Sequence, residues 1–149
     1  MLLILLDNVG FSVSKTFGGV VNMPTLDRLA QNGLIYNNFH TCSLCSPSRM
    51  ALITGRNSHS ANMGCVAEVA TAFPGNTAKR PNSVAPLAEM LKLNGYSSAY
   101  FGKSHEFAPW EQGLYGSFDS WPTQFGFGRF YGTLSGEGDM FAPRTHPRL

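Results

Sequence analysis

The stretch "SVAPLAEMLKLNGYSSAYFGK" (residues 83–103) sets a helical pattern directly before a strand pattern. We expect the helix to begin with Ser83 as its N-cap and to end at Gly95. Its apolar side chains share one helix face: Leu87, Met90 and Leu91. "SSAYFGK" (97–103) then predicts a β-strand that ends at Lys103.

The residues before this stretch predict further strands and helices. "LLILL" (2–6) is apolar on both faces, which is typical of a central parallel strand. The sequence next predicts a helix over 24–33, a strand over "LIYNNFH" (34–40), a short helix over 46–54 and a long loop over 57–82. The order β-α-β-α-α-β predicts an α/β fold, with a mostly parallel sheet flanked by helices.

From Glu106 onward the periodic pattern fades into aromatic residues and glycines. We interpret these aromatics as side chains that pack over a sheet edge rather than as a ligand cage. The final "RTHPRL" (144–149) has no periodicity, so no element is predicted there.

Composition narrows the class of protein. The chain of 149 residues is long enough for one domain with a core, and it is 43% hydrophobic and 13% charged with a net charge of +2. Without a basic run, neither nucleic acid nor a membrane surface is expected as a partner. The apolar start is too short for a signal peptide or a spanning helix. If Met1 is the true start we expect a cytoplasmic protein, and if a leader has been lost, a periplasmic or secreted one.

Three interpretations compete for the cysteines of "HTCSLCSPSRMALITGR" (40–56). Cys42 and Cys45 could help to bind zinc, although no second C-x-x-C pair exists to complete the site. They could instead form a redox pair at a helix start. In the third interpretation Cys42 and Cys65 are small buried residues, and Cys45 alone has a chemical task.

The sequence context of Cys45 favours the third interpretation. The residue precedes a helix, so backbone N–H groups and the helix dipole favour negative charge beside it. Arg49 follows at i+4 and therefore lies on the same helix face. A nucleophile, a fixed cation and a helix N-terminus together suit a tetrahedral oxyanion.

Cys45-Ser46-Pro47-Ser48-Arg49, followed by Thr54-Gly55-Arg56, resembles the C-x-P-S-R-x-x-x-x-T-G signature of type I sulfatases, in particular their arylsulfatase branch. Other segments resemble the same family in the same order: "LLILLDNVGF", "NMPTLDRLAQNGLIYNNFH", "LITGRNSHS" and "YFGKSH". The resemblance runs from about residue 2 to about residue 140. It implies the N-terminal portion of an alkaline-phosphatase-like α/β domain.

The resemblance implies that Cys45 is oxidised to formylglycine by a formylglycine-generating enzyme acting on the unfolded chain. The hydrated aldehyde would be the nucleophile toward a small-molecule sulfate ester. One Ca²⁺ ion per site would be held by Asp7, Asn8 and the modified Cys45. The family usually has Asp-Asp where this chain has Asp7-Asn8, so weaker metal affinity is expected.

The remaining site residues are also carried over from the resemblance. Arg49 and Lys103 would hold the diol and the developing sulfate charge. His105 lies two residues beyond Lys103, on the same side of a strand, and would bind the hydroxyl or move its proton.

Sulfatases of this family are several times longer than this chain, so residues 1–149 resemble a truncated N-terminal catalytic domain that lacks further metal and sulfate ligands. We expect poor solubility and no turnover from this polypeptide alone. Two alternatives stay open. One is a phosphonate or phosphate monoester hydrolase on the same scaffold, and the other is a non-catalytic zinc or redox module built on Cys42 and Cys45.

Overall fold

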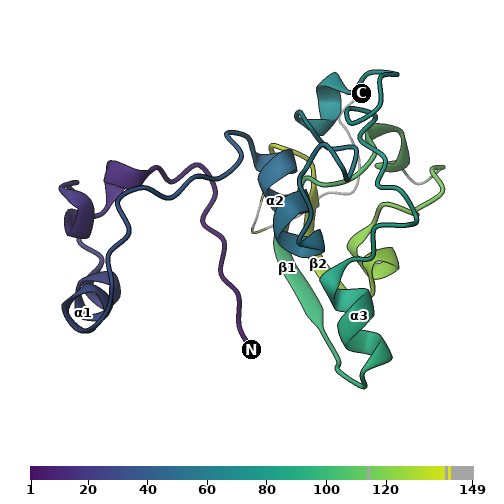
Figure 1. Ribbon diagram of the computed structural model, residues 1–149. Coiled ribbons are helices and arrows are strands. Elements are labelled where there is room, and N and C mark those ends of the chain that lie inside the picture. The colour runs from purple at the N-terminus through teal and green to yellow at the C-terminus, as the bar shows by residue number, and fades with distance from the viewer. Residues whose placement is uncertain (114, 140, 142–149) are drawn as a thin grey trace. The chain divides into compact units, whose positions relative to one another are not determined.

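The computed structural model describes residues 1–113, 115–139 and 141. It divides into two compact units, Met1–Thr41 and Cys42–Leu149. Figure 1 draws the elements of both units. In the described residues no helix combines the length and apolar character that crossing a membrane requires. The terminal "RTHPRL" lies outside the described residues.

The first unit is organised around helix α1, Pro24–Asn32. Pro24 occupies the first turn, where its missing N–H costs no hydrogen bond, and the helix ends before Gly33. The predicted helix is therefore confirmed. Two 3₁₀ helices, η1 (Phe11–Val13) and η2 (Lys15–Phe17), precede it. Thr16 Oγ1 of η2 donates to Asp27 Oδ1 of α1 at 2.6 Å and ties them together.

Both strands predicted for the first unit are wrong. Residues 2–6 and 34–40 form no strand, and the apolar side chains of 2–6 are exposed. A β-strand needs the backbone of a neighbour to hydrogen-bond with. The described part of this unit offers only one isolated bridge, between Ser14 and Val21. An apolar run without a partner strand therefore stays irregular, whatever its propensity.

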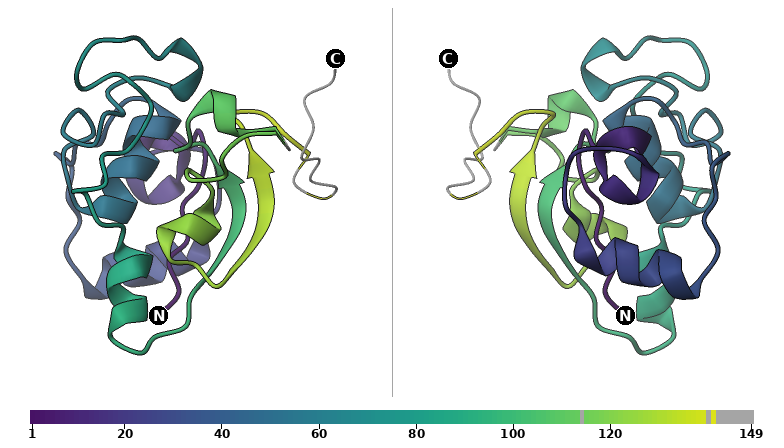
Figure 2. Two further views of the ribbon diagram at one scale, coloured as in Figure 1. Left: turned by 90° about the vertical axis from the view of Figure 1, so that its right-hand side faces the viewer. Right: turned by 90° about the vertical axis from the view of Figure 1, so that its left-hand side faces the viewer.

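The second unit contains a parallel two-stranded sheet, as the predicted α/β fold requires. Strand β1, Ala99–Ser104, confirms the predicted strand and pairs with β2, Arg129–Leu134. The two strands run side by side in the same direction (Figure 2). Their register places Gly102 opposite Gly132. The sequence did not predict β2, which lies in the glycine- and aromatic-rich part of the chain.

Two α-helices accompany this sheet. Helix α2, Cys45–Thr54, confirms the predicted short helix and ends at Gly55 in the left-handed conformation (φ 64°). Helix α3, Leu87–Leu93, has Pro86 as its N-cap and begins three residues later than expected, so Ser83 as N-cap is wrong. The residue before a proline avoids the helical conformation, and Pro86 itself is extended. The Pro86 carbonyl instead accepts the first helical hydrogen bonds.

The core of the second unit packs α2 against the long loop and the 3₁₀ helix η5, Pro122–Phe125. Its buried members are Met50, Ile53, Ala61, Met63, Ala67, Ala78 and Phe125. The predicted aromatic packing is confirmed in part. Tyr100 of β1 packs edge-on against Phe127 and Phe130, whereas Trp110 and Tyr115 are exposed.

Candidate active site

The N-terminus of α2 holds Cys45 in a fixed place. Leu44 precedes it in an extended conformation, and Ser48 Oγ donates back to the Leu44 carbonyl at 2.7 Å. Ser46 is fully buried, and its Oγ accepts a hydrogen bond from the Ala67 backbone N–H at 3.2 Å. The start of the helix is therefore anchored to the 3₁₀ helix η3, Ala67–Val69.

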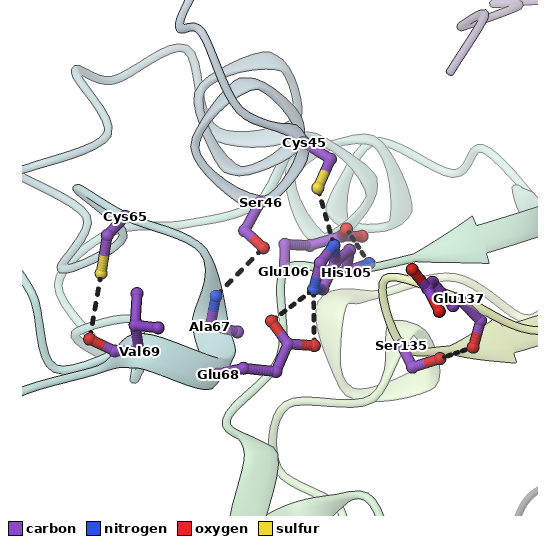
Figure 3. Close-up of polar contacts among 10 residues, drawn as sticks. All are labelled: Cys45, Ser46, Cys65, Ala67, Glu68, Val69, His105, Glu106, Ser135 and Glu137. Carbon is purple, nitrogen blue, oxygen red and sulfur yellow. Dashed lines mark hydrogen bonds and ion pairs between the residues drawn. The ribbon is translucent and has the colours of Figure 1, made fainter. Parts of the chain in front are cut away.

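The structure brings Cys45 together with His105. Cys45 Sγ lies 2.8 Å from His105 Nδ1, although the two residues are 60 positions apart in the sequence (Figure 3). His105 follows the last residue of β1 and is only 3% exposed, while Cys45 is half-buried. A thiol and an imidazole at hydrogen-bond distance form a nucleophile–base pair.

The second ring nitrogen of His105 contacts a carboxylate that the sequence analysis did not predict. His105 Nε2 lies 2.7 Å from both carboxylate oxygens of Glu68, which belongs to η3 (Figure 3). Glu68 stands in "CVAEVA", and no spacing or neighbouring motif there distinguishes it from an ordinary surface carboxylate. Thiol, imidazole and carboxylate thus form a continuous row from three separate segments.

Burial and charge set the protonation of this row. Burial lowers the pKa of His105 below 6.5, and the positive charges of Lys103 and Arg49 act in the same direction, while the hydrogen bond and charge of Glu68 oppose it. Burial pushes the pKa of Glu68 up, but its hydrogen bond and charge interaction with His105, together with hydrogen bonds from the backbone of Glu68 and Gly136, leave the pKa below 4.5. A neutral imidazole beside an ionised carboxylate is therefore the state near neutral pH.

Arg49 lies one turn after Cys45 and is buried. Its Nη1 donates to the Lys103 carbonyl at 2.7 Å and to the Tyr100 hydroxyl at 3.5 Å. The Tyr100 hydroxyl donates to the same carbonyl at 2.7 Å. Burial is the main cause that raises the pKa of Tyr100, so this hydroxyl stays a donor. Arg49 therefore joins α2 to the end of β1, the strand that leads into His105.

Lys103 and Glu106 are two further buried ionisable residues at this end of β1. Lys103 is 7% exposed and Glu106 is 1% exposed. The Glu106 carboxylate accepts from the His105 backbone N–H at 2.8 Å and from Ser104 Oγ at 3.2 Å. Burial raises the pKa of Glu106, although the hydrogen bond from the His105 backbone N–H and the Arg49 charge oppose the shift. Glu106 is a second residue that sequence reasoning missed.

Four of the six predicted site residues thus share the second unit: Cys45, Arg49, Lys103 and His105. The other two, Asp7 and Asn8, lie in the first unit and are exposed. Asn8 has a positive φ of 58°, so the chain turns sharply at this pair. A carboxylate and an amide oxygen are donors that suit a hard cation, so the pair fits Ca²⁺ in kind. The described residues contain no cluster of three or more His, Cys, Asp or Glu that could hold a metal.

Cys42 and Cys65 differ from Cys45 in their surroundings. None of the three cysteines forms a disulfide in this structure, and both Cys42 and Cys65 are half-buried rather than fully buried as expected. Cys42 Sγ donates to Ser58 Oγ and Cys65 Sγ to the Val69 carbonyl, each at 3.6 Å. The thiols of Cys42 and Cys45 therefore have different neighbours, which does not favour a redox pair.

Comparison with known proteins identifies the family. The family model described as Sulfatase matches residues 1–147. The chain belongs to the sulfatase family. An uncharacterised sulfatase of Schizosaccharomyces pombe is 35% identical over 148 residues, covering 95% of this chain and 25% of that protein. Arylsulfatase J of Mus musculus is 33% identical over 141 residues, covering 95% and 22%.

A third relative of this sulfatase chain is the N-acetylgalactosamine-6-sulfatase of Homo sapiens. It is 35% identical over 138 residues, covering 81% of this chain and 24% of that protein. The chain therefore spans about a quarter of the length of the curated relatives it matches. Among solved structures, the crystal structure of Ps i-CgsB aligns with a TM-score of 0.65 at 23% identity, covering 89% of this chain and 27% of that one. This likeness supports the fold.

Proposed function

We propose that this sulfatase chain carries the nucleophile of an arylsulfatase-type sulfuric ester hydrolase. The observation that carries the proposal is the 2.8 Å contact between Cys45 Sγ and His105 Nδ1 at the start of a helix whose next turn carries buried Arg49. Membership of the sulfatase family supplies the reaction class. The contact supplies a nucleophile position with a base beside it.

The proposed nucleophile is formylglycine made from Cys45 and hydrated to a geminal diol. One hydroxyl of the diol attacks the sulfur of the ester, and the alcohol leaves. The second hydroxyl then loses its proton, the carbonyl re-forms, and inorganic sulfate is released. Water adds to the aldehyde and restores the diol. A serine in this place would stop at a stable sulfated alcohol, because it has no second hydroxyl with which to expel sulfate.

The burial of the signature supports modification of the chain before it folds. Ser46 and Pro47 are buried in α2, and Arg49 is only 6% exposed. An enzyme that reads these side chains cannot reach them in the folded unit. We therefore propose that a formylglycine-generating enzyme acts on the unfolded chain.

His105 is the proposed base at the diol. Its Nδ1 faces the place now taken by Sγ, and its depressed pKa leaves it able to accept a proton near neutral pH. Arg49 and Lys103 supply positive charge at the same end of β1, where negative charge develops as sulfate is transferred. Arg49 also fixes the strand end through its bond to the Lys103 carbonyl.

Asp7 and Asn8 would hold a divalent cation, with Ca²⁺ as the proposed ion. When bound, such an ion would polarise the sulfuryl oxygens and favour ionisation of the diol. One carboxylate beside one amide brings less negative charge than two carboxylates, so we expect weak metal affinity from this pair.

Mass spectrometry across residue 45 tests the proposal directly. The chain is produced with and without a formylglycine-generating enzyme, and the peptide containing residue 45 is analysed for thiol or aldehyde. We expect an aldehyde at residue 45 only with the enzyme, with Cys42 and Cys65 unchanged as internal controls. An Arg49→Ala chain, which lacks the signature arginine, should remain a thiol. A thiol at residue 45 under every condition would refute the formylglycine step.

The substrate class is tested separately with a full-length relative, because this chain covers only about a quarter of its relatives. Nitrophenyl sulfate and nitrophenyl phosphate are compared at equal concentration. Faster hydrolysis of the sulfate supports the proposal, and faster hydrolysis of the phosphate supports the phosphate monoester hydrolase instead.

A further inference from the structure

We propose that Glu68 is the positioning residue of His105: its carboxylate holds the imidazole in the tautomer whose Nδ1 can accept a proton from the group at residue 45. That this positioning serves catalysis rests on the proposed function, in which His105 is the base. The geometry that carries it is the pair of 2.7 Å distances from His105 Nε2 to both oxygens of Glu68.

The chemistry of the carboxylate fixes where the proton lies. The pKa of Glu68 lies below its usual value, so the group is ionised near neutral pH and can only accept hydrogen bonds. Nε2 must therefore carry the proton that it donates to Glu68. In the neutral imidazole Nδ1 is then the acceptor, and Cys45 S–H donates to it. The contact between Cys45 and His105 alone would not select that tautomer, because a thiol can donate or accept a hydrogen bond.

A second connection keeps Glu68 in register with residue 45. The Ala67 backbone N–H donates to Ser46 Oγ at 3.2 Å, and both residues are fully buried. The residue after Cys45 is thus bonded to the residue before Glu68 (Figure 3). The nucleophile and the positioning carboxylate therefore sit on opposite sides of His105 and share one rigid anchor.

The role agrees with the proton balance of the proposed step. When a diol hydroxyl attacks, its O–H bond breaks and the proton moves to Nδ1. The Nε2 proton stays in its bond to Glu68, whose charge stabilises the imidazolium that forms. Without Glu68 the two 2.7 Å contacts that keep the proton on Nε2 are lost, so Nδ1 can carry the proton instead and cannot then accept one from residue 45.

The test uses the 149-residue chain with an unmodified thiol, so it does not depend on sulfatase turnover. Imidazole ¹⁵N NMR reports the tautomer of His105, assigned with a His105→Gln chain. The rate of iodoacetamide alkylation at Cys45 reports whether Nδ1 can accept the thiol proton, with Cys42 and Cys65 as internal references. Glu68→Gln removes the charge and keeps one acceptor oxygen, and Glu68→Asp keeps the charge on a shorter side chain.

Glu137→Gln is the matched control. Glu137 is exposed and lies on the segment after β2, and its replacement removes an equal charge without touching the bond between Glu68 and His105 (Figure 3). Glu68 is itself about half-exposed, so its replacement by an isosteric amide should leave the fold intact, which the dispersion of the amide spectrum checks.

We expect the parent chain and Glu137→Gln to show the Nε2–H tautomer. In Glu68→Gln the Nδ1–H tautomer should become populated, and alkylation of Cys45 near neutral pH should slow about three- to tenfold. The alkylation rate of Glu68→Asp should lie between those of the parent chain and Glu68→Gln. An unchanged His105 tautomer and Cys45 alkylation rate in both Glu68 variants would overturn the proposal. Failure of the proposed function would be seen separately. Residue 45 would then never be converted from thiol to aldehyde, while the Glu68 variants would still change the tautomer of His105.

Discussion

Replacing Gly132 with alanine should separate β2 from β1, the strand that leads into His105. A Cβ atom at Gly132 would lie 1.8 Å from the Gly102 carbonyl oxygen and 2.6 Å from its carbon. Real Cβ atoms do not approach closer than 3.0 Å, so β2 must retreat from β1 by about 1.2 Å. The obstacle is backbone rather than a flexible side chain, so no rotamer change relieves it.

That retreat is large enough to break hydrogen bonds between β1 and β2. An N–H···O bond near 2.9 Å becomes longer than 4 Å and contributes almost nothing. Each lost bond costs about 0.5–1.5 kcal/mol net, so the loss of two or three neighbouring bonds predicts about 1–4.5 kcal/mol of lost stability. His105 directly follows β1, so its contact with Cys45 should weaken as well.

Urea unfolding followed by tryptophan fluorescence measures this effect. Trp121 is a suitable reporter, because its ring lies edge-on to Phe130 of β2 with centroids 6.5 Å apart. The control is Gly128→Ala, just before β2, where the new Cβ would meet only the Ser98 carbonyl oxygen at an ordinary 3.5 Å. That variant should change the free energy of unfolding by less than about 1 kcal/mol. Equal unfolding midpoints for the two variants would refute the pairing of Gly102 with Gly132 in the sheet.

Three further changes test other parts of the second unit. Phe125→Ala empties a core position that is 1% exposed and should cost about 3–5 kcal/mol in urea unfolding; a loss below about 1 kcal/mol would contradict its place in the core. The stability contributed by the depressed pKa of His105 should be lost as pH falls below 6.5. The parent chain should therefore lose unfolding free energy relative to the His105→Gln chain below that pH. This comparison also cancels the opposite contribution of buried Glu106, whose pKa is raised. Lys79→Met leaves the Glu111 carboxylate buried without its cation and should cost about 1–3 kcal/mol at pH 7. Because interactions such as that with Lys79 hold the pKa of Glu111 below 4.5 against the effect of burial, the loss should shrink as pH falls below 4.5, and a loss that does not vary with pH would count against the ion pair.

Local sequence patterns correctly predicted helices whose ends are fixed by residues at or next to those ends in the sequence. Pro24 and Gly33 bound α1, and Gly55 ends α2 because glycine adopts a positive φ without strain. The same patterns misplaced the start of α3, where the effect of Pro86 on the preceding residue outweighed the capping tendency of Ser83. Strand predictions succeeded only for β1, since a strand depends on a neighbour that periodicity does not reveal.

The sequence by itself determined the family signature, the helix that begins at Cys45 and the position of Arg49 one turn later, because these features depend on spacing within a few residues. Only the tertiary structure decided that His105 meets Cys45, that Glu68 binds the far side of the same imidazole, and that β2 pairs with β1. Those contacts join segments tens of residues apart. They form because packing of the core and pairing of the strands bring the segments together, and no local pattern encodes that meeting.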